Sequence, residues 1–134
     1  MDNKILIDTD ILIDFLRGNS ETGLLLEKIQ DRTLLTTDIN AFELYHGAYK
    51  QKDKEKGILD VERMLNQLQL LSTNRKSMRK AGEIVTYLDK KGEKVDTADI
   101  LIGSICIINS ASILTRNRKH FEKMNVRIFE EEIK

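Results

Sequence analysis

The stretch KILIDTDILIDFL, residues 4–16, decides the fold. Residues 4–8 are predicted to form a buried strand that ends at Asp8. Apolar side chains then recur with helical spacing until Gly18, which is typical of a helix end. A strand followed at once by a helix is the repeating unit of α/β proteins. Asp8 stands at the junction, where an ionised carboxylate is costly to bury unless a cation or a proton meets it.

The rest of the chain alternates short apolar runs with longer helical periods, as a parallel sheet flanked by helices does. Ser20 is the expected cap of the second helix, and Gly57 and Gly92 are expected to break the chain. Further strands are expected at residues 33–37, 68–72, 112–116 and 126–129. Helices are expected at 10–16, at 20–30, from Thr37 or Asp38 through Glu43, after 57 to about 66, at 75–91 and at 97–108.

Length and charge limit the classes of protein that this chain can belong to. Its 134 residues are expected to form one domain over residues 1–134, and 22 basic against 22 acidic residues exclude a non-specific nucleic-acid coat. Cys106, the single cysteine, lies in an apolar run and is expected to be buried. The chain lacks a signal-peptide pattern and an apolar run near the ~20 residues of a membrane span, so we expect a cytoplasmic protein without membrane contact.

Three acidic residues lie within or at the ends of apolar segments that supply no matching Lys or Arg. They are Asp8, Glu43 in INAFELYHGA (39–48) and Asp99 in VDTADILIGSICII (95–108). If the first strand and the 112–116 strand are neighbours, Asp8 and Asn117 both fall at the carboxyl ends of parallel strands, where α/β sheets place their sites. Carboxylate oxygens without a His or Cys cluster predict a hard divalent cation, Mg²⁺ or Mn²⁺, and argue against zinc.

Four segments in this order resemble the motifs of PIN-domain nucleases, and the short chain is similar to the VapC-type toxins of prokaryotic toxin–antitoxin pairs. The segments are LIDTDILIDFLRG, the Asn-Ala-Phe-Glu-Leu helix, Asp-Ile-Leu-Ile-Gly-Ser and Leu-Thr-Arg-Asn-Arg-Lys-His-Phe. The resemblance implies a PIN-like three-layer α/β fold with a short, mostly parallel sheet of about four to five strands. It also implies a Mg²⁺- or Mn²⁺-dependent endoribonuclease, an RNA substrate and a small cognate antitoxin that inhibits it. We further expect a homodimer.

Carried over position by position, the resemblance assigns the acidic metal-binding core to Asp8, Glu43 and Asp99. Asn117 matches a fourth position that is often an aspartate in the family, and Asp96, which lies outside the usual motif, is a candidate to compensate. One or two ions held there would lower the pKa of a coordinated water and neutralise charge during phosphodiester displacement. No protein nucleophile is then required.

Polar residues beside these acids have candidate roles and structural alternatives. Asp10 and Asp14 are interpreted as a cap and a solvated residue rather than as ligands, and Asp96 as a cap before a ligand. His46 is not expected to be a general base, and His120 is expected to make a structural hydrogen bond. Thr9 and Thr115 are expected either to hydrogen-bond a ligating carboxylate or water, or to satisfy the backbone. The candidate substrate-binding residues are Thr9, Thr115, Arg116, Arg118 and Lys119, of which the last three are the candidate phosphate contacts.

Two other classes of protein compete with the nuclease hypothesis. A phospho-acceptor receiver module also gathers acids at the end of a parallel sheet, but it needs an aspartate closing the third strand and a lysine closing the fifth. The strands here end in LLSTN and IFEEE, so both are missing. A catalytically degenerate PIN-like protein that binds RNA or serves as a scaffold is the second alternative. The neutral Asn117 is its one supporting sign.

Overall fold

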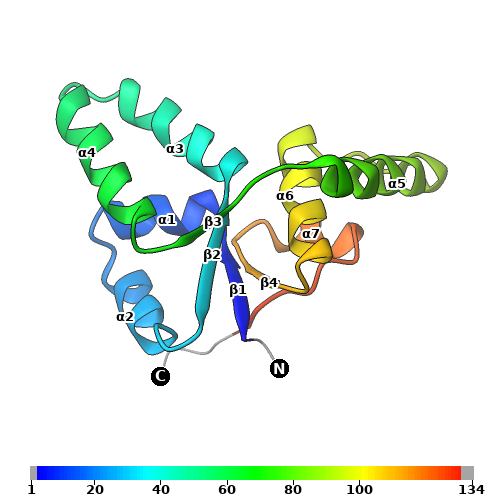
Figure 1. The fold of residues 1–134 in the computed structure, drawn as a ribbon, viewed down its shortest axis with the longest axis horizontal. Coiled ribbons are helices and arrows are strands. Elements are labelled where there is room, and N and C mark those ends of the chain that lie inside the picture. Colours follow the sequence, from blue (N-terminus) through cyan, green and yellow to red (C-terminus); the bar gives the residue numbers. More distant parts are fainter. Residues whose placement is uncertain (1–2, 131–134) are drawn as a thin grey trace.

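A parallel four-stranded sheet with the order β3-β2-β1-β4 forms the centre of the computed structural model, which describes residues 3–130 (Figure 1). β1 is central because Ile5 pairs with Leu34 on one side and with Ser112 on the other. The prediction that the first strand lies beside the 112–116 segment is therefore confirmed. The strands are β1 Lys4–Ile7, β2 Thr33–Thr37, β3 Gln69–Leu71 and β4 Ser112–Leu114.

Helices cover both faces of the sheet and give a three-layer α/β fold, as predicted. Successive side chains of a strand point to opposite faces. Leu6 accordingly packs with the cluster under α5, α6 and α7, whereas Ile5 and Ile7 pack with the cluster under α1 to α4 (Figure 1). The helices are α1 Thr9–Leu16, α2 Ser20–Lys28, α3 Asp38–Tyr49, α4 Lys54–Leu65, α5 Arg75–Lys91, α6 Thr97–Ile108 and α7 Arg118–Lys123.

Several helices begin or end where the sequence predicts. Thr37 caps α3 by accepting a hydrogen bond from the backbone N–H of Asn40 at 3.1 Å. Gly18 and Gly92 follow α1 and α5 with φ of 78° and 68°, a left-handed conformation that favours glycine. Cys106 is buried, as expected, and burial raises the pKa of its thiol to about 12. Within residues 3–130, no helix is both long and apolar enough to cross a membrane.

Gly57 is not a break, which corrects the sequence prediction. α4 begins before it, at Lys54, and Asp53 caps the helix by accepting from the Lys56 N–H at 3.1 Å. A Cβ atom at position 57 would lie 3.2 Å from the carbonyl oxygen of Ala48 on α3. The glycine is therefore needed for close approach of α3 and α4, not for a turn.

One predicted helix cap and one predicted strand were wrong, and one helix was missed. The helix expected to begin at Ser20 is capped by Asn19, which accepts from the Thr22 N–H at 2.9 Å. The expected strand at 126–129 is reduced to a single parallel bridge between Ile113 and Ile128, because β4 itself spans only three residues. α7, within the fourth polar motif, was not predicted as a helix.

Candidate active site

Asp8 follows β1 and lies at the carboxyl end of the sheet, where it caps α1. Its carboxylate accepts three hydrogen bonds: from the Thr9 N–H at 2.9 Å, from Asn40 Nδ2 at 3.0 Å and from Thr115 Oγ1 at 2.6 Å. The residue is 4% exposed. A carboxylate offers about four acceptor sites, so roughly one is left for another partner.

Asp8 is hard to ionise in this environment. Burial raises its pKa from 3.8 to about 6, against the hydrogen bonds from Thr115 and Thr9, and the negative charges of Asp10 and Asp99 raise the pKa further. Asp99 is therefore near enough for its charge to raise the pKa of Asp8. This region therefore combines crowded negative charge with low solvent access.

Glu43 is brought to Asp8 by α3. Its Oε1 accepts from Thr9 Oγ1 at 2.6 Å, and the same Thr9 hydroxyl accepts from Asn40 Nδ2 at 2.9 Å. Thr9 and Thr115 thus both hydrogen-bond carboxylates, which was the first of the two alternatives for them. We call the side chains of Asp8, Glu43 and Asp99, with the polar groups that hold them, the acidic edge.

Asp99 enters the acidic edge from the first turn of α6. His120 on α7 contacts it, with Nδ1 2.8 Å from Asp99 Oδ2, so the prediction of a structural hydrogen bond for this histidine is confirmed. His46 takes no part in the acidic edge. Its ring stacks on that of exposed Phe42, with 6.2 Å between the ring centroids.

Asp96 and Asn117 lie at the N-cap positions of α6 and α7, both exposed and neither making a side-chain cap hydrogen bond. Asn117 is tied to the site through its backbone, whose N–H donates to Thr115 Oγ1 at 3.0 Å. Across the described part of the chain, no three Asp, Glu, His or Cys side chains converge closely enough, as they stand, to enclose a metal ion. A fourth ligand at 96 or 117 remains a prediction.

Asp10 and Asp14 are not simply a cap and a solvated residue, which corrects the interpretation from sequence. Asp10 Oδ2 accepts from the backbone N–H of Arg116 at 3.0 Å, and Asp14 forms an ion pair with the Arg116 guanidinium. Both acids therefore hold the loop between β4 and α7 against α1. Arg116 is already paired, as is Arg118 with Glu130 at 3.4 Å. Exposed ion pairs are weak, so their phosphate contacts, like that of exposed Lys119, stay predictions.

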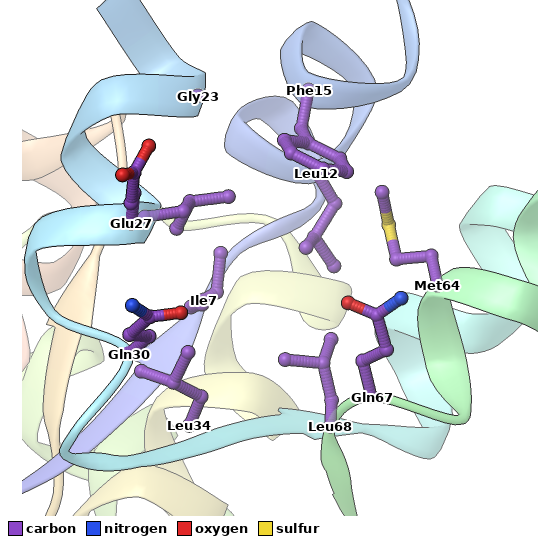
Figure 2. A pocket seen from close by; sticks show the side chains of 11 residues that line it. Ile7, Leu12, Phe15, Gly23, Glu27, Gln30, Leu34, Met64, Gln67 and Leu68 are labelled. Carbon is purple, nitrogen blue, oxygen red and sulfur yellow. The ribbon is translucent and has the colours of Figure 1, made fainter.

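An apolar groove of about 300 Å³ opens beside the acidic edge, between α1, α2 and the chain that follows α4. Figure 2 shows Leu12 and Phe15 of α1 facing Leu34, Met64 and Leu68 across the hollow. Gln30 and Gln67 place amides at its sides, and Glu27 lies on α2. Ile7 lines the groove one residue before Asp8, so groove and acidic edge share the end of β1.

The match to known proteins agrees with this geometry. The family model described as PIN domain matches residues 5–126. The chain belongs to the PIN domain family. Ribonuclease VapC3 of Methanocaldococcus jannaschii is 35% identical over 99 residues, covering 74% of this PIN domain and 94% of that protein. Ribonuclease VapC2 of Rickettsia felis is 30% identical over 95 residues, covering 71% of each.

A solved structure has the same architecture. VapBC2 from Rickettsia felis, bound to a DNA fragment from its promoter, contains a chain that superposes with a TM-score of 0.87 at 26% identity. The match covers 95% of this PIN domain and 97% of that chain. The sequence prediction of a PIN-like fold is confirmed.

Sequence reasoning missed Asn40 at the acidic edge. The residue is fully buried and hydrogen-bonds both Asp8 and Thr9. One signal was present, because Asn40 stands three residues after Thr37, the spacing of a reciprocal helix cap. That spacing explains its backbone contacts but not its contact with Asp8, which depends on how β1 and α3 pack.

Proposed function

We propose that this PIN domain is a Mg²⁺- or Mn²⁺-dependent endoribonuclease and the toxin of a VapBC-type toxin–antitoxin pair. The names of its relatives support ribonuclease activity. The observation that carries the proposal is the buried Asp8, whose charge is opposed by burial and by two neighbouring carboxylates. A divalent cation relieves such crowding more fully than a single ion pair does.

The residues present fit a hard cation. Asp8, Glu43 and Asp99 offer oxygen ligands only, and Asp10 Oδ1 is a buried oxygen without a hydrogen-bond partner in the described residues. Mg²⁺ keeps several waters and is commonly held by one or two carboxylates plus a substrate phosphate, so three converging side chains are not required. Asp8 and Asp99 are the proposed holders, with Glu43 beside them and Asp96 or Asn117 as the further candidates.

Each residue of the site has a defined task in this proposal. When bound, the cation lowers the pKa of a water and neutralises charge on the scissile phosphodiester. Asp8 is fixed by Thr115 and Asn40, and His120 fixes the orientation of Asp99. Lys119, exposed on α7 next to His120, is the proposed contact to a neighbouring RNA phosphate.

The test is RNA cleavage by the protein purified free of any partner. Cleavage should require Mg²⁺ or Mn²⁺ and stop with EDTA, and Asp8→Asn should lower the rate by a factor on the order of 10³ or more while the fold is retained. Asp31→Asn, an exposed carboxylate on the loop after α2, is the matched control and should cleave normally. Full activity in excess EDTA, or wild-type cleavage by a folded Asp8→Asn protein, would contradict the proposal.

The partner that we propose is a small antitoxin, and we assign its docking segment to the apolar groove. The Rickettsia felis relative was solved as the pair VapBC2. An amphipathic helix that places apolar side chains between α1 and α2 would cover the groove, and a cation following it would reach the acidic edge one residue beyond Ile7. We place the protein in the cytoplasm, where RNA and antitoxin are present. The homodimer stays a prediction.

The alternative function is a degenerate PIN domain that binds RNA without cutting it. The observation in its favour is the neutral, exposed Asn117 at the position where the resemblance expects an aspartate. The two functions separate in one experiment, because a degenerate protein binds RNA equally with and without metal and leaves it intact. Cleavage that appears with Mn²⁺ and disappears in Asp8→Asn excludes the alternative.

A further inference from the structure

One fully buried amide connects the elements of the acidic edge. Asn40 is 0% exposed, at the third position of α3, and its Nδ2 donates to Asp8 Oδ1 at 3.0 Å and to Thr9 Oγ1 at 2.9 Å. Its Oδ1 accepts from the Thr37 N–H at 3.2 Å and from Thr37 Oγ1 at 2.7 Å. Both donors and the acceptor oxygen are therefore used, which fixes the orientation of the amide.

The Thr9 hydroxyl connects the Asn40 amide to Glu43. It accepts from Asn40 and donates to Glu43 Oε1 at 2.6 Å, so its single proton is committed to the carboxylate. Asp8 and Glu43 come from different elements and are 35 positions apart in the chain. The Asn40 amide and the Thr9 hydroxyl are the hydrogen-bonding groups that join them.

The charges of the network require this direction of hydrogen bonding. Two carboxylates can be linked through neutral groups only if those groups donate at both ends, as the amide N–H and the threonine hydroxyl do here. An apolar side chain at position 40 would remove one of the three donors to Asp8, and an apolar side chain at position 9 would remove the hydroxyl donor to Glu43, at a cost in orientation rather than in packing.

We propose that Asn40 and Thr9 are positioning residues that set the orientation of Asp8 and Glu43 for metal binding. This inference rests on the proposed function. Thr9 thereby acts on the acids and not on the substrate. Partners of metal-binding side chains typically change metal affinity or activity by about 10- to 100-fold when removed.

The experiment separates this role from the capping role that Asn40 shares with Thr37. Asn40→Ala removes the donors to Asp8 and Thr9 as well as the cap. Thr37→Ala removes the hydroxyl that caps the helix and contacts the Asn40 oxygen, but it keeps both amide donors and the Thr37 N–H that holds the amide oxygen. Mn²⁺ dissociation constants from calorimetry should rise about 10- to 100-fold in Asn40→Ala and stay within about threefold in Thr37→Ala. In RNA cleavage, Asn40→Ala should lower kcat and leave KM for RNA unchanged.

Equal effects of the two variants, or wild-type Mn²⁺ affinity in a folded Asn40→Ala protein, would overturn the proposal. If Asn40→Ala does not fold, the pair Thr9→Val and Thr9→Ser decides. Thr9→Val should weaken Mn²⁺ binding and Thr9→Ser, which keeps the hydroxyl, should restore it. Wild-type affinity in Thr9→Val would overturn the role of Thr9 in the network.

A wild type that neither binds Mn²⁺ nor cuts RNA would refute the proposed function and not this network. The link is then measured in metal-free protein by a double-mutant cycle of Thr9→Val and Glu43→Gln in urea unfolding. Coupling of about threefold or more in the unfolding constant supports the link, and additive effects overturn it.

Discussion

The acidic edge and the apolar groove meet at the end of β1, one residue apart, yet they are built on opposite principles. In the acidic edge, hydrogen bonds hold the side chains: Asp8 accepts three, and Asn40 uses both the donors and the oxygen of its amide. In the groove, Phe15 is 42% exposed and faces Leu68 across the hollow (Figure 2). Hydrogen bonds within the chain therefore hold the acidic edge in place, whereas the groove is an apolar surface that the proposed partner would cover.

The difference shows how a small chain can carry a cation site and an apolar binding surface that have opposite requirements. A cation site needs oxygen atoms held in place before the ion arrives, which a hydrogen-bonded network provides. A protein partner gains binding energy by covering apolar surface, which requires that surface to be open beforehand. Ile7, which lines the groove, and Asp8, which belongs to the acidic edge, give these two properties to adjacent positions of the chain.

The sharpest way to break this comparison is to damage the groove alone. Phe15 is 42% exposed and lines the groove, and Phe15→Asp should weaken antitoxin binding by about 2–4 kcal/mol because a charge enters an apolar contact. RNA cleavage by the free protein should stay at the wild-type level. Both are measured on purified protein, the first by calorimetric titration with the cognate antitoxin.

Leu24→Asp is the matched control. Leu24 is 58% exposed on α2 but does not line the groove, so its substitution should leave antitoxin affinity unchanged. Equal weakening by the two variants would show that the groove is not the docking surface. Loss of RNA cleavage in folded Phe15→Asp would show that groove and acidic edge are not separate.

A change of pH should act on the acidic edge and not on the groove. Burial raises the pKa of Asp8 from 3.8 to about 6, the hydrogen bond from Thr115 opposes this shift, and the charges of Asp10 and Asp99 add to it. Between about pH 4 and 6 the folded protein therefore binds more protons than the unfolded one. The free energy of unfolding of metal-free protein should therefore fall as pH rises through that window. At pH 7 the raised pKa of Asp8 should lower the free energy of unfolding by an amount on the order of 2–3 kcal/mol.

Urea unfolding in EDTA at several pH values measures this effect. Asp8→Asn should remove the fall and be more stable than wild type at pH 7, whereas Asp31→Asn should keep it. Mn²⁺ favours the ionised carboxylate, so it should stabilise wild type most at neutral pH. An unfolding free energy that rises from pH 4 to 6 for wild type relative to Asp8→Asn would contradict the pKa shift.

The smallest expected effect concerns whether position 117 or position 96 belongs to the acidic edge. Asn117→Asp places a carboxylate at an exposed N-cap of α7, where a gain of less than about 1 kcal/mol in stabilisation by Mn²⁺ is expected. Melting curves against Mn²⁺ concentration, at constant ionic strength, measure it. If Asn117→Asp strengthens the response and Asp96→Asn leaves it unchanged, the fourth position belongs to 117. The reverse pattern assigns it to 96.

Much of the architecture was predictable because it depends on local patterns. The apolar run at β1 and the apolar period of α1 predicted the first unit, and Gly18 and Gly92 ended their helices as expected. The position of Asp8 followed from strand order alone, since the carboxyl ends of β1 and β4 must meet in a parallel sheet.

The missed features depend on contacts between elements distant in sequence. Gly57 looked like a break because glycine is a common turn residue, but the packing of α3 on α4 required it. The sequence suggested a cap for Asp10 and a solvated side chain for Asp14, but both contact Arg116, which follows β4 more than 100 positions later in the chain. Asn40 had a local explanation as part of a helix cap, which concealed its contact with Asp8.

The hydrogen bond from Thr115 to Asp8 joins positions 107 apart in the chain, and it has a consequence for biosynthesis. A ribosome makes β1 long before β4 and α7, which bring Thr115 and His120. Translation at roughly 5–20 residues per second therefore imposes a delay of several seconds between the appearance of Asp8 and that of its final partners. A nascent chain therefore has no complete acidic edge until β4 and α7 have been made, although Asp8 itself is among the first residues of the domain to appear.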